Sequence, residues 1–157
     1  MAVRAAKFGD MPRLVELGRE MHAKSKYADQ PGNERVFKAT FIEAIRLHVA
    51  GKGGCLFVAE KDGVVEGYIL GVVCRVYNVC DVYEARDMFF FVTDRADKRD
   101  AARLAKALIK WASGLPDVIE INMGATDAIS DFGRTEKLYQ RLGMSQNGVL
   151  YTKRVKP

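Results

Sequence analysis

The turn over residues 94–103 concentrates the groups of this chain that could bind an anion. It follows an apolar stretch over 87–93 that is typical of a buried strand, and it leads into a predicted helix. Backbone N–H groups at a helix N-terminus lack partners within the helix, and the helix dipole adds positive charge there, so this arrangement favours phosphate. Ala101 and Ala102 are small enough to let a phosphate approach the backbone. The nearby cations are Lys98, Arg99 and Arg103. A solvated basic helix start is the other interpretation of the same residues.

Tyr139 is a second candidate, within the sequence LYQRLGM. The spacing predicts a short helix over 134–142, which Gly143 ends. Leu138 and Leu142 fall on one helical face, whereas Tyr139 lies one step round the helix and could face a cleft. The same spacing also suits a tyrosine that packs in the core.

Several other chemical motifs are absent from the sequence. Neither GxxxxGK[ST] nor GxGxxG occurs, so a P-loop or dinucleotide-binding fold is not expected. Cys55, Cys74 and Cys80 form no CxxC pair, and His22 and His48 are far from them in the sequence. We therefore predict reduced thiols and no metal site.

The elements that must position these groups follow from the hydrophobic periodicity. Strands are predicted over 2–8, 55–60, 64–74, 87–93, 118–124 and 149–155, with a less regular piece over 76–85. Helices are predicted from Asp10, as N-cap, through Met21, from Asn33, as N-cap, to Gly51, and over 100–113 and 134–142. The unit from strand 87–93 to strand 118–124 has the length of a βαβ crossover, which makes its two strands parallel. The other neighbours form hairpins, so we expect an α/β fold with a mixed, mostly antiparallel sheet and helices on both faces.

Length and composition predict one globular domain over residues 1–157. The chain carries 25 Lys and Arg against 20 Asp and Glu, a net charge of +5, and 48% of its residues are hydrophobic. No apolar run approaches the roughly 18 residues of a membrane span, and the first residues resemble no leader peptide, so we expect a cytoplasmic protein without a membrane partner. The excess of basic over acidic residues favours acidic ligands. Aromatic and basic residues are not interleaved, so nucleic acid is not the expected partner.

Two segments resemble the GCN5-related N-acetyltransferase family. LYQRLGM, from Leu138, is similar to the family's C-terminal LYEKLGF signature, and MFFFVTDRADKRDAARLAKALIKWA, from Met88, is similar to its acetyl-CoA motif. The order of elements also matches over nearly the whole chain. The resemblance implies a single-domain acyl-CoA N-acyltransferase fold. Its seven-stranded sheet splits between the fourth and fifth strands and admits the pantetheine arm of acetyl-CoA.

The resemblance also implies an activity. The reaction is direct transfer of an acetyl group from acetyl-CoA, as co-substrate and without a metal, to a primary amine on a small molecule or a peptide. Tyr139 matches the family's general acid, and Asp87 stands where some members carry a carboxylate that could act as base. We expect Asp87 to share an apolar face with Phe89 and Phe91. The implied cofactor-binding residues are Phe91, Val92, Thr93, Lys98, Arg99, Asp100, Ala101, Ala102 and Arg103.

The turn departs from the family pattern in a way that supports an alternative. The family's R-x-x-G-x-G/A falls on residues 97–102, and only the last small residue is kept. Asp100 can cap the N–H groups that a phosphate needs. A catalytically degenerate module of the same fold, with a binding or structural role, is therefore the alternative function. Glu84 and Asp81 are rival bases, the sequence does not specify the acceptor amine, and a homodimer stays open because dimers are common among relatives.

Overall fold

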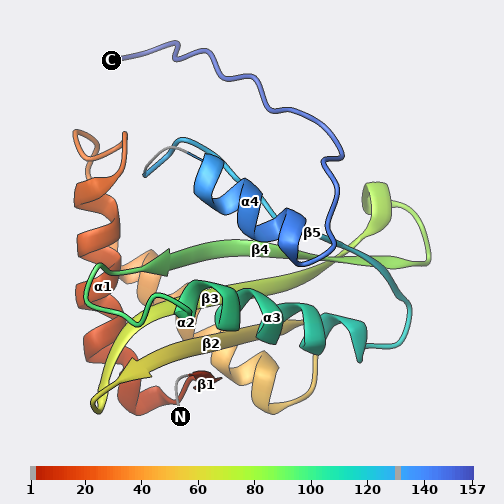
Figure 1. Ribbon diagram of the computed structural model, residues 1–157, viewed down its shortest axis with the longest axis horizontal. Coiled ribbons are helices and arrows are strands. Elements are labelled where there is room, and N and C mark those ends of the chain that lie inside the picture. The colour runs from red at the N-terminus through yellow and green to blue at the C-terminus, as the bar shows by residue number, and fades with distance from the viewer. Residues whose placement is uncertain (1–2, 130–131) are drawn as a thin grey trace.

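The computed structural model describes residues 3–129 and 132–157, and a five-stranded sheet forms the centre of the described part (Figure 1). The strands lie in chain order: β1 (Val3–Ala5), β2 (Gly54–Lys61), β3 (Val64–Arg75), β4 (Tyr83–Val92) and β5 (Val118–Asn122). β1 to β4 pair antiparallel, whereas β4 and β5 pair parallel. The predicted βαβ unit and the mixed, mostly antiparallel sheet are confirmed. Ala2, where the predicted first strand begins, lies outside the described residues.

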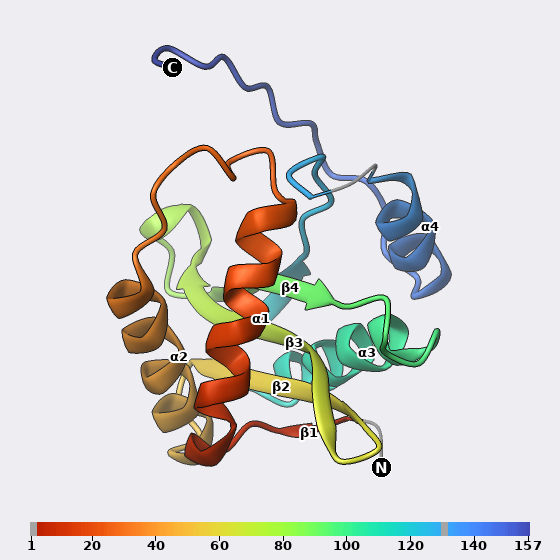
Figure 2. The ribbon, with the colours of Figure 1, turned by 90° about the vertical axis from the view of Figure 1, so that its left-hand side faces the viewer.

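Helices cover both faces of the sheet (Figure 2). α1 (Met11–Lys24) and α2 (Glu34–Val49) lie on one face, and α3 (Asp100–Ser113) and α4 (Gly133–Arg141) lie on the other. Two 3₁₀ turns, η1 (Phe8–Asp10) and η2 (Val76–Asn78), complete the elements. One apolar core joins α1 and α2 to the sheet through Phe41 and Tyr68, and a second joins α3 through Leu104 and Leu108. No helix among the described residues is long and apolar enough to cross a bilayer.

Local sequence explains where several elements begin and turn. The Asn33 side chain accepts a hydrogen bond from the Val36 N–H at 3.1 Å and so caps α2 as predicted. Asp62 and Gly63 both have positive φ, at 51° and 80°, which gives the tight turn between β2 and β3. Asp10 is the N-cap residue of α1, as predicted, but its side chain makes no capping hydrogen bond. Its carboxylate accepts from the Lys7 N–H at 2.8 Å and pairs with Arg4.

A β-bulge at Met88 changes which face of β4 its neighbours occupy. Asp87 pairs with Gly71 and Phe89 pairs with Leu70, so Met88 is the extra residue on β4. Phe89 packs against the α2 core, whereas the Asp87 carboxylate points to Gly124 after β5. The expectation that Asp87 shares an apolar face with Phe89 is therefore wrong, because the inserted residue breaks the period of two.

β4 and β5 separate part of the way along β4. Their register runs from Tyr83 opposite Val118 to Arg86 opposite Asn122. β4 continues to Val92 without a partner on that side among the described residues, so a split opens beside residues 87–92. The bulge at Met88 lies at the start of the split, where a bend in β4 directs the strand away from β5.

The predicted strands differ from the structure in several places. β1 ends at Ala5 rather than at residue 8, and β5 ends at Asn122 rather than at residue 124. Residues 83–85 belong to β4 rather than to an irregular piece. The irregular residues before them obscure this strand in the sequence, but residues 83–85 pair with β3 on one side and with β5 on the other. Residues 149–155 form no strand, and they run exposed away from the sheet toward Asp29, which Arg154 contacts at 2.9 Å. The described part of the sheet accordingly has five strands rather than seven.

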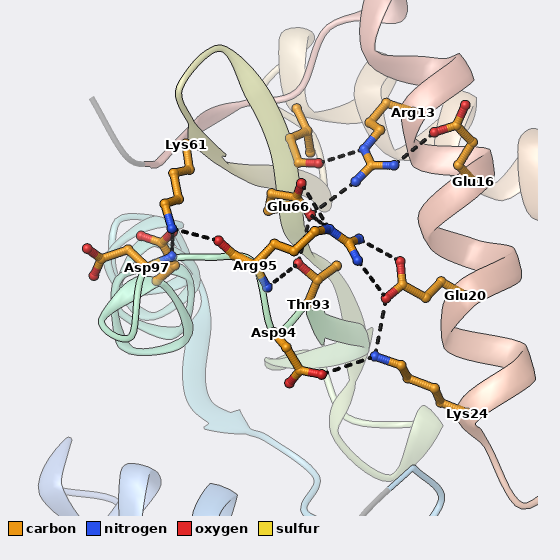
Figure 3. A network of polar contacts seen from close by, with 12 residues as sticks. Arg13, Glu16, Glu20, Lys24, Lys61, Glu66, Thr93, Asp94, Arg95 and Asp97 are labelled. Carbon is orange, nitrogen blue, oxygen red and sulfur yellow. Dashed lines mark hydrogen bonds and ion pairs between the residues drawn. The ribbon is translucent and has the colours of Figure 1, made fainter.

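A nearly buried carboxylate, Glu66 of β3, ties the end of β4 to α1 (Figure 3). It accepts hydrogen bonds from the Thr93 hydroxyl at 2.7 Å, from Arg13 at 3.0 Å and from Arg95 at 3.1 Å. Arg95 reaches on to Glu20 of α1 at 2.8 Å. The network therefore fixes the turn that follows β4 against the first helix.

Glu66→Gln removes the charge that holds this network together. We expect the free energy of unfolding to fall by about 2 kcal/mol, because charge-assisted hydrogen bonds to a buried group are among the stronger ones. Urea denaturation measures the change. The matched control is Glu16→Gln, since Glu16 also pairs with Arg13 but is exposed, and its loss should cost less than about 0.5 kcal/mol. Equal losses for the two variants would contradict the role of Glu66.

Candidate active site

Gly124 brings Tyr139 and Asp87 together at the split. The Gly124 N–H donates to Asp87 Oδ1 at 2.8 Å, and the Tyr139 hydroxyl donates to the Gly124 carbonyl at 3.1 Å. Asp87 comes from β4, Gly124 follows β5, and Tyr139 comes from α4. The two predicted catalytic residues therefore meet around one backbone unit, just beyond the last paired residues of β4 and β5.

Burial shifts the protonation of both side chains. It raises the pKa of the Tyr139 phenol well above its ordinary value, and the nearby Asp87 charge raises this pKa further. Burial also raises the pKa of the half-buried Asp87 carboxyl, and the Gly124 N–H offsets part of this rise. Tyr139 consequently keeps its proton at neutral pH, and Asp87 holds a proton more readily than an exposed aspartate does.

The backbone of β4 directs some N–H groups into the split and others toward β3. The Thr93 N–H donates to the Glu66 carbonyl at 2.9 Å, so Thr93 is bonded on the β3 side, as is its hydroxyl. Because partners alternate along an antiparallel ladder, the Phe91 N–H also faces β3, whereas the N–H groups of Phe90 and Val92 face the split. Of Phe91, Val92 and Thr93, which were predicted to hold the cofactor at the end of β4, Val92 therefore has its N–H directed to the split.

Carboxylates of the chain itself occupy part of the predicted phosphate turn. Asp100 is fully buried, and its side chain accepts from the Asp97 N–H at 3.1 Å and from Arg103 at 2.9 Å. Asp97 in turn accepts from the Arg99 N–H at 2.8 Å. Two backbone donors of the turn are thus already capped, and Arg103 is paired.

Other donors of the turn stay accessible. Ala101 and Ala102 lie in the first turn of α3, where helix geometry provides no partner for the backbone N–H. Lys98 and Arg99 are exposed beside them. Two backbone N–H donors and two cations of the turn can therefore bind an anion. The buried negative charge of Asp100 lies close by and would repel it.

The rival bases lie outside the split. Glu84 is buried in the paired part of β4, where its carboxylate binds Arg86 and Asn122. Asp81 is exposed and pairs with Arg75 at 2.7 Å. Across residues 3–129 and 132–157, no three His, Cys, Asp or Glu side chains gather as a metal site would require.

Gly124 and Glu66 were missed by the sequence analysis. A glycine after a predicted strand is ordinary, and nothing in the sequence marks its N–H and carbonyl as the link between Asp87 and Tyr139. Glu66 sits between apolar residues on a hairpin strand, where alternation predicts an exposed side chain. Its partners Arg13 and Thr93 are distant in the sequence, so no local signal could have identified it.

Comparison with solved structures shows the fold. Glucosamine-6-phosphate N-acetyltransferase from Arabidopsis thaliana matches with a TM-score of 0.69 at 14% identity, over 98% of this chain and 97% of that one. Ribosomal-protein-alanine N-acetyltransferase from Brucella melitensis biovar Abortus 2308 matches with a TM-score of 0.69 at 14% identity, over 97% and 96%. Aminoglycoside N-acetyltransferase AAC(6')-Iy, in complex with CoA, matches with a TM-score of 0.68 at 19% identity, over 98% and 94%.

The chain therefore has the single-domain fold of these N-acetyltransferases, as the resemblance implied. No family model matches the sequence, and no curated protein matches it.

Asp87→Asn tests whether the pKa of the Asp87 carboxyl is raised in the folded protein. The folded-state pKa lies above the unfolded value of 3.8, so the ionised carboxylate costs stability at every pH above that value. Asp87→Asn should therefore raise the free energy of unfolding at pH 8, and the gain should shrink as the pH falls toward 4. Denaturation at a series of pH values measures it. Asp81→Asn, at an exposed carboxylate, should stay within about 0.5 kcal/mol. A loss of stability in Asp87→Asn at pH 8 would contradict the raised pKa.

Proposed function

We propose that this chain is an N-acetyltransferase of the GCN5-related family, which transfers an acetyl group from acetyl-CoA to a primary amine in the cytoplasm. The observation that carries the proposal is the convergence of Asp87 and Tyr139 on Gly124, at the point where β4 and β5 separate. A proton acceptor and a proton donor then flank a split that also offers the backbone N–H of Val92.

These groups match the proton transfers that aminolysis of a thioester requires. A primary amine with a pKa near 10.4 is neutral in only about one molecule per thousand at pH 7. Asp87 would accept the proton that the amine loses as the C–N bond forms. Tyr139 would donate its proton to the sulfur as the C–S bond breaks. The N–H of Val92 would stabilise negative charge on the carbonyl oxygen.

The fit of acetyl-CoA differs between its two halves. The thioester arm suits the split, because unpaired strand N–H groups can hold an extended amide-containing chain as a neighbouring strand would. The diphosphate would lie at the first turn of α3, held by the N–H groups of Ala101 and Ala102 with Lys98 and Arg99. The buried Asp100 opposes this second contact. We therefore expect the contacts in the split to contribute most of the affinity for acetyl-CoA.

The acceptor is proposed as a primary amine on a small molecule or a peptide. The names of the three solved structures specify a sugar phosphate amine, an aminoglycoside and a ribosomal protein alanine as their own acceptors. A degenerate module with a binding role is the second candidate, and the capping of the turn by Asp97 and Asp100 is the observation that favours it.

Tyr139→Phe tests the general acid. We expect kcat to fall by about 10²-fold with KM little changed, because the substitution removes the proton donor and leaves the ring in place. Release of the CoA thiol, with a panel of amino sugars, aminoglycosides and peptides as acceptors, measures the activity. Tyr77→Phe is the control, since Tyr77 is an exposed tyrosine of the turn between β3 and β4. Unchanged turnover in Tyr139→Phe would exclude Tyr139 as the acid.

Asp100→Asn tests the phosphate turn. The amide oxygen can still accept from the Asp97 N–H, but the negative charge is gone. Removing about 1 kcal/mol of repulsion should tighten CoA binding about fivefold. Calorimetric titration with CoA measures the change, and acetyl-pantetheine, which lacks the diphosphate, should bind the variant and the wild type equally. The same change for both ligands would show that Asp100 does not act on the phosphates.

A further inference from the structure

Cations form one row on α3 and another on α4. The members of each row follow one another at intervals of three or four residues, which places them on one side of their helix. All of them are exposed except Arg103, which is half-buried. The α3 row comprises Arg99, Arg103, Lys106 and Lys110, and the α4 row comprises Arg134, Lys137 and Arg141. These basic rows therefore face solvent on the side of the sheet that α3 and α4 cover.

The basic rows are poorly neutralised by the chain itself. Arg103 pairs with Asp97 and Asp100 at the start of α3. The other members of the rows form no ion pair with any residue of 3–129 or 132–157. On the opposite face, by contrast, α1 pairs each of its Arg and Lys side chains with a carboxylate. The cations of α3 and α4 are thus available to an acidic partner.

The basic rows flank the split. In both views β4 runs between α3 and α4, so one row lies on each side of the strand that forms the firm wall of the split (Figures 1 and 2). A donor that inserts a thioester arm into the split from this face would therefore have the rest of its body over the basic rows.

Coenzyme A does not account for both rows. Its diphosphate would lie at the first turn of α3, and Lys110 is ten residues beyond Asp100, about 15 Å along the helix. The one phosphate that remains on coenzyme A can contact only a few of the cations. The buried Asp100 also repels the two charges of a diphosphate. A donor with one phosphate and a larger acidic body would fit this face better.

We propose that an acidic carrier protein, which bears the acetyl group on a phosphopantetheine arm, docks on the basic rows and delivers its arm to the split. The inference rests on the proposed function, since the arm is the one that coenzyme A also carries. The carrier's phosphodiester brings one negative charge to the turn beside Asp100, where a diphosphate brings two. Acidic side chains of the carrier would pair with the rows and speed association.

The reaction is the same aminolysis with a different leaving group. The amine nitrogen attacks the thioester carbonyl and forms the C–N bond, and Asp87 accepts the proton that the nitrogen loses. The C–S bond breaks, and Tyr139 donates its proton to the sulfur. The products are the N-acetylated amine and the carrier with its free thiol.

Binding of the carrier, without acyl transfer, is the first test. The probe is a labelled bacterial fatty-acid carrier protein, an acidic helical protein, as the holo form with the arm and as the apo form without it. Fluorescence anisotropy at about 50 mM salt should give tighter binding for the holo form by about fivefold, because the arm adds contacts in the split. Both affinities should fall as salt is raised, since ionic contacts are screened.

Charge reversal on α3 tests the docking surface. Lys106→Glu together with Lys110→Glu should weaken binding of the holo-carrier by about tenfold or more. Turnover of acetyl-pantetheine, which has neither phosphate nor carrier, should stay unchanged and so report an intact split. Arg35→Glu together with Lys52→Glu is the control. It makes the same charge change at exposed sites of α2 and the turn after it, and should leave carrier affinity unchanged.

The activity provides a second readout. For the wild type, kcat/KM should be about tenfold higher with the acetylated carrier than with acetyl-CoA, because the rows add affinity for the carrier. Lys137→Glu together with Arg141→Glu, in the α4 row, should remove this advantage.

The carrier inference is overturned by any of three results. The holo form binds no more tightly than the apo form, the α3 variant and its control lose affinity equally, or duplex RNA binds the basic rows more tightly than the carrier does. Turnover of acetyl-CoA without binding of the carrier would overturn this inference and leave the proposed function standing. If no thioester is turned over, the proposed function fails, and the anisotropy still decides whether the carrier docks.

Discussion

The separation of β4 from β5 after Arg86 and Asn122 is the constraint on which the candidate site depends. Where two strands part, the backbone groups at the junction lose their ladder partners and must find others. At Gly124 both groups are satisfied by side chains, the N–H by Asp87 and the carbonyl by Tyr139. The residues proposed to move protons thus also complete the end of the sheet's hydrogen bonding. This double role holds Asp87 and Tyr139 in place before any substrate arrives.

The two walls of the split are stabilised by different means. Packing around Phe41 and Tyr68 supports β4 from the α2 side, and Glu66 links its end to Arg13 and Arg95. By contrast, β5 is short and has no strand partner on its outer edge among the described residues. The described part of α4 has one buried residue, Tyr139. A split with one firm wall and one lightly supported wall can widen without disturbing the main core.

The sequence predicted the elements whose patterns are local. The α2 cap at Asn33 and the Asp62–Gly63 turn follow from residues a few positions apart, and the βαβ unit follows from the periodicity of three consecutive segments. Each is confirmed. The resemblance selected Tyr139 and Asp87, which periodicity alone could not have paired. Features that depend on an inserted residue or on partners distant in the sequence could not be predicted. The bulge at Met88, the Gly124 link and the Glu66 network belong to this group. The strand predicted over 149–155 is wrong, because strand-forming residues also need a sheet edge to pair with, and this segment runs away from the sheet.

The most direct test of acetyl-CoA binding in the split is to locate acetyl-CoA on the protein by backbone amide NMR. Titration of the ¹⁵N-labelled protein with acetyl-CoA should shift the amide signals of residues 87–92 and of Gly124, with smaller shifts at Ala101 and Ala102. Titration with acetyl-pantetheine should keep the first group of shifts and lose the second. Donor binding in the split would be contradicted if millimolar acetyl-CoA left the signals of residues 87–92 and Gly124 unshifted, or if the shifts clustered elsewhere in the fold.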